Sequence, residues 1–134
     1  MKIDEKLLIE KALEARANAY APYSEFTVGA TILCENGKIY TGCNIENAAY
    51  PAGICAERVA LGKAISSGER DFVAIAIVGG KGDERVACTP CGMCRQALSE
   101  FVHDDFTFII EEDGFKSISM AELLPRRFTS EALK

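Results

Sequence analysis

Apolar and polar positions follow a helical period at the start of the chain and a strand period soon after it. Leucine and alanine recur on one face of residues 8–19 behind Asp4, which favours the N-cap position, and this predicts an amphipathic helix ended by residues 21–24. β-branched and aromatic residues then dominate 26–34 and 38–43, with an Asn-Gly pair between the two runs. Asn-Gly is the strongest local signal for a tight turn, so the two runs predict a β-hairpin.

The remainder of the chain switches repeatedly between helical and strand-like patterns. Residues 55–67 carry alanine at every fourth position and are followed by glycine, which predicts a helix. Residues 72–78 and 106–110 are short continuous apolar runs, typical of strands buried on both faces. The other predicted elements are a loop over 79–83, a helix over 91–101, a strand over 115–118 and a short helix capped by Ser119.

These elements follow one another in the order α-β-β-α-β-α-β-β-α. A strand, a helix and a strand in succession at the centre predict a right-handed parallel crossover. No internal repeat or linker interrupts the pattern. We therefore expect one α/β domain over residues 1–134, a three-layer α-β-α sandwich with a mixed sheet of about five strands.

The charge and composition of the chain indicate which kinds of molecule it can bind. The chain is 49% hydrophobic and 26% charged, and its formal net charge is −5. An acidic balance disfavours nucleic-acid binding, which rests on clustered Lys and Arg, and favours a small neutral substrate. No apolar run reaches the roughly 18 residues of a membrane span, and the acidic N-terminal stretch is unlike a signal peptide. We expect a cytoplasmic protein without a nucleic-acid or membrane partner.

Cysteine spacing carries the main chemical signal. In a reducing cytosol, cysteines serve metal binding, catalysis or burial rather than disulfides. Cys34 and Cys43 fall in predicted strands, where a free thiol behaves as a small hydrophobe. Cys55 and the Cys91-x-x-Cys94 pair both open predicted helices, whose N-termini favour thiolates. Three protein ligands with an open fourth position are typical of catalytic zinc, so we expect one zinc ion per chain at Cys55, Cys91 and Cys94.

Two further residues are weaker candidates for the metal. His103 lies about three turns along the helix from Cys91, too far to reach the same ion, and is expected at the surface or helix end. Cys88 is near Cys91 in sequence and remains a minor alternative as a fourth ligand. Pro90 makes that geometry awkward.

Glu57 and Arg58 follow the first cysteine directly. A carboxylate in the first helical turn, beside a zinc-bound water, can take and return a proton, which is the role we expect for Glu57. Arg58 lies three residues after Cys55, on the same helix face, and can hydrogen-bond the sulfurs and withdraw electron density. If the cysteines were absent, we would instead expect Glu57 only to complement the helix dipole. Arg58 would then be expected to form a surface ion pair.

The chain resembles the signature of zinc deaminases in two stretches, Cys55-Ala56-Glu57 and Pro90-Cys91-x-x-Cys94, with cysteine in place of the first histidine. Other stretches resemble the small homotetrameric cytidine deaminases and occur in that family's order along nearly the whole chain. These stretches are 23–30 (YSEFTVGA), 42–48 (GCNIENA), 54–58 (ICAER), 90–96 (PCGMCRQ) and 122–125 (ELLP).

The resemblance implies a cytidine deaminase-like fold and hydrolytic deamination of cytidine and deoxycytidine to uridine and deoxyuridine, with release of ammonia, in pyrimidine salvage. Water activated by the zinc would attack C4 of the cytosine ring. Glu57 would protonate N3 and then the leaving amine. The resemblance also implies a homotetramer whose active sites are shared between subunits.

It further implies roles for residues around the base and the ribose. The backbone N–H of Ala56 and the carbonyl of Thr89 would hold the base edge and the leaving group, and Phe26 would stack near the base. Asn44 and Glu46 would hydrogen-bond a ribose hydroxyl. Phe26 as a core residue, and the Asn44–Glu46 pair as a turn after a strand, remain the alternatives.

Two residues are implied at subunit boundaries. Phe128 would close the pocket of a neighbouring subunit, and Tyr50 would lie at a subunit contact. Arg126 and Arg127 are bulkier than the small residues found in the resembling proteins, which leaves the placement of Phe128 open.

Other function classes compete with this hypothesis. A blasticidin-type deaminase would use the same metal chemistry on another cytosine compound. A non-catalytic zinc module would have no use for Glu57, and a dithiol redox protein built on Cys91 and Cys94 would need no third cysteine. A nucleic-acid editor is disfavoured by the acidic balance.

Overall fold

Five strands form a single mixed sheet in the computed structural model, which describes residues 2–134. The strand order is β2-β1-β3-β4-β5. The central pair, β3 and β4, is parallel and every other neighbouring pair is antiparallel. The strands are β1 (Phe26–Cys34), β2 (Ile39–Cys43), β3 (Phe72–Lys81), β4 (Thr107–Glu111) and β5 (Phe115–Ser119). The hairpin and the central parallel crossover are as the sequence predicts.

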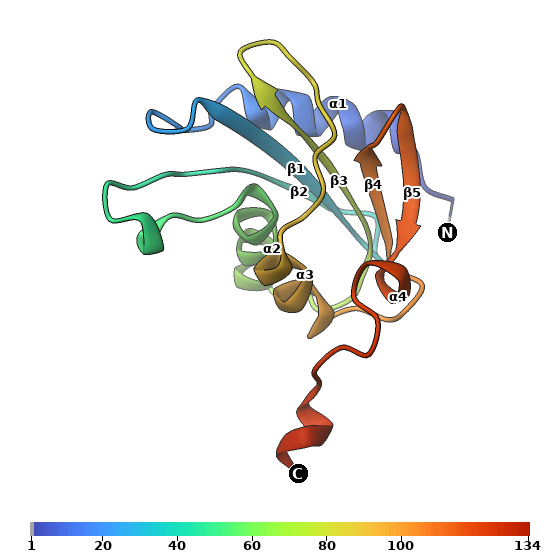
Figure 1. Cartoon of the computed structure of the whole chain (residues 1–134). Helices are drawn as coiled ribbons and strands as arrows, with labels where there is room; N and C mark the ends of the chain where they lie inside the picture. The colour runs from blue at the N-terminus through green and yellow to red at the C-terminus, as the bar shows by residue number, and fades with distance from the viewer. Residues whose placement is uncertain (1) are drawn as a thin grey trace.

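Helices cover both faces of this sheet (Figure 1). On one face lies α1 (Glu5–Arg16), and on the other lie α2 (Ala56–Ser66) and α3 (Gly92–Ser99). The short helix α4 (Met120–Leu123) follows β5, and the chain then runs away from the sheet to a final 3-10 turn, Ser130–Leu133. The expected three-layer α/β sandwich is therefore confirmed.

The sheet separates two apolar cores, and β3 contributes to both. Ile75 and Ile77 pack in the larger core beneath α2 and α3. Ala74 and Ala76 alternate with them and pack in the smaller core with Leu8 of α1. Because successive strand residues point to opposite faces, this alternation accounts for the continuous apolar run in β3.

Glycine allows α1 to approach the sheet closely. A Cβ on Gly29 of β1 would overlap the Ala12 carbonyl oxygen and would lie 2.7 Å from the Arg16 backbone nitrogen. The close approach fixes the helix against β1.

Two element ends differ from the sequence prediction by three residues, and in both cases tertiary pairing decides the outcome. The opening helix stops at Arg16 rather than near Ala19, because Tyr20 pairs with Ile45 in a parallel bridge. The loop predicted over 79–83 is wrong for its first three residues, which continue β3 and pair with the start of β1. Glycine at positions 79 and 80 suggested a loop but instead lies in a crowded strand.

None of the helices described in residues 2–134 has both the length and the apolar character needed to cross a bilayer.

Candidate metal centre and active site

Two helix starts bring three cysteine sulfurs together. Cys55 is the N-cap residue of α2, Cys91 is the N-cap of α3, and Cys94 lies in the first turn of α3. Their Sγ atoms all lie within 4.8 Å of one another. The Cys55–Cys91 separation is 3.8 Å and the Cys91–Cys94 separation is 3.4 Å.

This spacing fits zinc. Tetrahedral coordination with Zn–S bonds of about 2.3 Å places two sulfurs about 3.8 Å apart. Cys94 is buried, Cys55 is half-buried and Cys91 is exposed, so the cluster is open on one side. Three thiolates with one open side match a site that retains a position for water or substrate.

Hydrogen bonding inside the cluster already favours a thiolate at Cys55. The Cys94 thiol donates to the Cys55 sulfur and, together with the nearby Arg58 guanidinium, lowers the pKa of Cys55 to about 5. The same bond and burial raise the pKa of Cys94. The buried Nε of Arg58 has no hydrogen-bond partner among residues 2–134. Arg58 therefore favours the thiolate form of Cys55.

Glu57 is buried directly beside this cluster. Its side chain is 4% exposed in the first turn of α2. Burial raises its pKa to about 7, and the negative charge on Cys55 adds to the effect. Glu57 in turn contributes to a raised pKa of about 11 for Cys88, whose main cause is burial. A carboxyl group that titrates near neutrality can both accept and donate a proton.

A pocket of about 610 Å³ opens beside the sulfurs. Cys55, Cys91 and Arg58 form one side of it, and Asn44, Glu46 and Tyr50 also line it. The structure therefore brings six of the predicted site residues to one cavity, of the size that small-molecule sites typically have.

Asn44 and Glu46 are both held in place by the protein. The Asn44 side chain accepts from the Val28 N–H at 2.8 Å and donates to the Phe26 carbonyl at 2.8 Å, which fastens it to β1. The Glu46 carboxylate accepts from the Tyr23 N–H at 3.0 Å, the Ser24 N–H at 3.1 Å and the Ser24 hydroxyl. The Ser24 hydrogen bonds lower the pKa of Glu46 and keep it charged.

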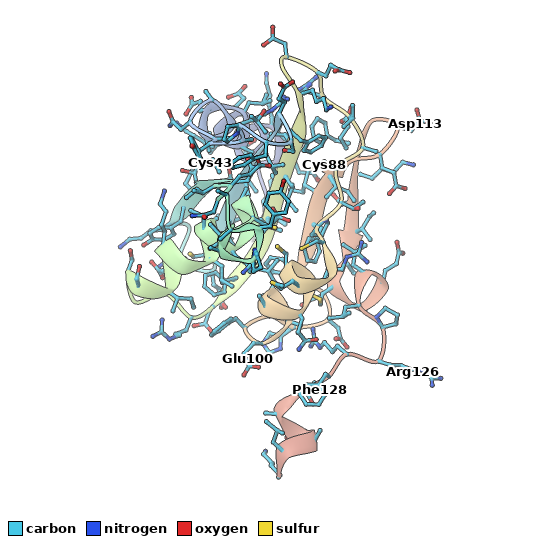
Figure 2. The ribbon with its side chains drawn as sticks, turned by 60° about the vertical axis from the view of Figure 1, so that its left-hand side comes forward. Cys43, Cys88, Glu100, Asp113, Arg126 and Phe128 are labelled. Atoms are coloured by element: carbon cyan, nitrogen blue, oxygen red, sulfur yellow. The ribbon has the colours of Figure 1, made fainter. Side chains whose placement is uncertain are left out.

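Four predicted substrate-binding residues are not among those lining the pocket: Phe26, Ala56, Thr89 and Phe128. Phe26 packs against the larger core, in agreement with the alternative prediction that it is a core residue. Ala56 is buried and Thr89 is exposed. The Phe128 side chain is 60% exposed on the C-terminal segment, outside the body of the molecule (Figure 2).

The remaining metal candidates stay apart from the cluster. His103 is exposed, and within residues 2–134 only the three cysteines form a group able to hold a metal ion. Cys34 and Cys88 are buried free thiols and Cys43 is half-buried.

Sequence reasoning assigned no role to Tyr23, Ser24 or Met93, which also line the pocket. Tyr23 and Ser24 meet Glu46 because Tyr20 pairs with Ile45 across 25 positions. No local pattern reports such a pairing. The signal available was the YSEF stretch itself, with two polar groups just before a strand.

Comparison with known proteins agrees with this geometry. Residues 1–110 match the family model described as the cytidine and deoxycytidylate deaminase zinc-binding region. A cytidine deaminase of Halalkalibacterium halodurans is 44% identical over 131 residues, covering 96% of this chain and 97% of that protein. The crystal structure of a cytidine deaminase from Burkholderia pseudomallei superposes with a TM-score of 0.85 at 40% identity, covering 94% of this chain and 100% of the other.

A blasticidin-S deaminase of Bacillus cereus is more distant, at 32% identity over 127 residues, covering 91% of this chain and 90% of that protein. Family membership rests on the 110-residue match and on the close relatives along nearly the full length. The chain belongs to the cytidine and deoxycytidylate deaminase family, as its paired cysteine motifs and its α/β sandwich together indicate.

Proposed function

We propose that this protein catalyses the zinc-dependent hydrolysis of cytidine and deoxycytidine, in which water replaces the amino group and ammonia leaves, giving uridine and deoxyuridine. The observation that carries the proposal is a three-thiol cluster beside a buried carboxyl group at a pocket of about 610 Å³. Hydrolytic deamination needs both a metal Lewis acid and a proton carrier, and these residues supply a place for each.

Cys55, Cys91 and Cys94 would hold the zinc ion. When bound, zinc lowers the pKa of its water ligand toward about 7 and so supplies a nucleophile at neutral pH. Glu57 would carry one proton to N3 of the base and one to the departing amine, a task suited to its pKa of about 7. Arg58 would offset the negative charge of the thiolates.

The substrate would lie across the pocket. Asn44 and Glu46 would hydrogen-bond a ribose hydroxyl, with little ordering cost because β1 and Ser24 already hold them. The Ala56 N–H and the Thr89 carbonyl would bind the base edge and the leaving group, with Phe26 near the base. Ala56 directly follows Cys55, Thr89 precedes Cys91 by two residues and Phe26 begins β1, and we propose that all three make contact once substrate and metal are in place.

We further propose a cytoplasmic homotetramer, with each chain a single catalytic domain acting in pyrimidine salvage. Tyr50 is 75% exposed at the pocket and Phe128 is 60% exposed on a projecting segment, so both have apolar surface available for a neighbour. In this assembly, Tyr50 would lie at a subunit contact and Phe128 would close the site of an adjacent subunit.

The test measures cytidine turnover by ultraviolet absorbance. We expect one zinc per chain, loss of activity with a chelator and recovery when zinc is restored. Glu57→Gln should lower kcat by about 10²–10⁴-fold, since a positioned proton carrier contributes that much. Glu10→Gln, an exposed carboxylate on α1, is the matched control and should be unchanged.

Full turnover by Glu57→Gln would overturn the role of Glu57 as proton carrier, whereas no cytidine turnover by the zinc-loaded unaltered protein would leave the non-catalytic zinc module. The relationship to the blasticidin-S deaminase makes that antibiotic the second substrate to assay. Faster turnover of the antibiotic than of cytidine would overturn the nucleoside assignment.

A further inference from the structure

Arg95 follows the buried cysteine Cys94 on α3, and its side chain binds two backbone carbonyl groups. Its Nε donates to the Pro90 carbonyl at 2.8 Å, and its Nη1 donates to the Leu123 carbonyl at 2.8 Å. The guanidinium therefore joins the residue just before Cys91 to the last residue of α4. Neither the proposed chemistry nor the pocket lining uses this residue.

The backbone N–H of Arg95 makes a third bond, to the Cys91 carbonyl at 3.0 Å. One residue thus holds the carbonyl groups on both sides of Cys91. Together these bonds fix the two peptide groups from which the Cys91 Cα and Sγ project.

Cys91 needs this support more than the other two cysteines do. Residues 82–91 form an irregular connection between β3 and α3, and Cys91 is exposed at its end. Cys94, in contrast, is buried within α3, and Cys55 is half-buried at the start of α2. The position of the Cys91 sulfur depends on how firmly the 90–91 peptide is held.

We propose that Arg95 is a positioning residue of the metal centre, which holds the Cys91 sulfur at metal-binding distance from its partners by anchoring the surrounding loop to α4. This inference rests on the zinc site of the proposed function. Because Arg95 offers two N–H donors in a rigid fork, it can bind two carbonyls at once, whereas lysine has one flexible ammonium group. Substitution of Arg95 should therefore make the position of the Cys91 sulfur less fixed, while all three cysteine ligands remain present.

The test measures the rate at which the zinc-loaded protein loses its metal to an excess of a chromogenic chelator. Residues that support metal ligands typically contribute 10- to 100-fold to metal affinity, so Arg95→Met should release zinc at least about 10-fold faster than the unaltered protein. Arg95→Lys can keep one of the two bonds and should give an intermediate rate.

Arg70→Met is the matched control. Arg70 also donates to two backbone carbonyls, those of Ile65 and Glu69, but these lie at the end of α2 opposite Cys55. Its zinc release should stay within about twofold of the unaltered protein, while thermal unfolding reports any general loss of stability in either variant. Cobalt-loaded protein adds a second readout, since the thiolate-to-cobalt absorption of Arg95→Met should change and that of Arg70→Met should not.

Equal zinc release by the Arg95 and Arg70 variants, or an unchanged cobalt spectrum in Arg95→Met, would overturn the proposal. If Arg95→Met fails to fold, Arg95→Lys decides, and a release rate equal to that of the unaltered protein would count against a positioning role. A different result, the absence of tightly bound zinc from the unaltered protein, would overturn the proposed function itself. The two failures are therefore distinguishable.

Discussion

At the scale of single residues, burial gives Glu57 properties that the exposed carboxylates of the chain lack. Its side chain is 4% exposed, and its pKa is raised to about 7 because desolvation disfavours the charged form. An ordinary surface glutamate is fully ionised at neutral pH and is a poor proton donor. Burying this carboxyl group lowers the folding stability at neutral pH, and it keeps the pKa of the group near 7.

This cost predicts a pH dependence of stability in the metal-free protein. The folded-state pKa of Glu57 lies above the unfolded value of 4.5, so its contribution to stability is present below pH 4.5 and is lost as the pH rises through 7. Relative to Glu57→Gln, which cannot ionise, the free energy of unfolding should fall by about 2–3 kcal/mol between pH 5 and pH 8. Urea unfolding of both proteins at the two pH values measures this, and parallel pH profiles would contradict it.

Arg126 illustrates a residue whose side chain does not suit its backbone. It has a positive φ of 54°, a left-handed conformation that costs a non-glycine residue about 1–2 kcal/mol. Glycine adopts this conformation readily because it has no Cβ. The Arg126 side chain points into solvent (Figure 2).

We therefore expect Arg126→Gly to keep or raise the stability, by up to about 1 kcal/mol, because glycine adopts this conformation without strain. Thermal or urea unfolding measures the change. Arg126→Ala is the control, since it removes the side chain but retains the strain. A clear loss of stability in the glycine variant alone would show that the strain argument is wrong.

At the scale of elements, the packing of α1 on the sheet depends on a missing side chain. A methyl group at Gly29 would collide with the α1 backbone at Ala12 and Arg16. Gly29→Ala should therefore destabilise the protein by about 1–3 kcal/mol, the usual range for overpacking. Gly62→Ala is the matched control, because nothing lies within 4 Å of its added methyl group on α2.

The control should stabilise the protein by about 0.5–1 kcal/mol through helix propensity. Denaturant unfolding compares the two variants directly. If Gly29→Ala were as stable as Gly62→Ala, the close approach of α1 to β1 would be incorrect.

Local signals identify most of these elements, and distant contacts set the rest. The Asn-Gly hairpin turn and the Ser119 cap, which accepts from the Glu122 N–H at 3.2 Å, were both readable from neighbouring residues. The early end of α1 and the extension of β3 depend on partners elsewhere in the chain, such as the pairing of Gly80 with Thr27. Propensity cannot report those partners.

The same distinction holds for the candidate site. Cys55, Cys91 and Cys94 could be grouped from spacing and helix position alone. The bonds of Asn44 to β1 and of Arg95 to Leu123 could not, because they join residues 18 and 28 positions apart through the fold. For Phe26, likeness to a family position did not reveal that the side chain also packs against the larger core.

At the scale of the whole molecule, the projecting C-terminal segment predicts dependence on a second copy. The Gln96 side chain donates to the Phe128 carbonyl at 3.1 Å, which orients the segment while the Phe128 ring stays exposed. Light scattering after gel filtration should give a tetramer. Phe128→Ala should raise KM for cytidine about 10-fold or more with a smaller change in kcat, as expected when a wall of the binding pocket is lost.

Leu133→Ala is the control, because it removes a side chain that is 78% exposed on the same segment without a predicted role in the site. A fully active monomer would refute the shared site. Equal effects of the two substitutions would indicate that the segment acts as a whole rather than through Phe128.

The meeting of two helix starts at the three sulfurs has a consequence for the unfolded chain as well. Cys55 and Cys91 are 36 positions apart, and all of β3 lies between them. An ion held by both would act as a reversible cross-link closing a loop of that length, for which chain-entropy arguments give about 4 kcal/mol. The ion that serves catalysis would thus also restrain the central crossover of the fold, and the removal of zinc would weaken the architecture that positions Glu57.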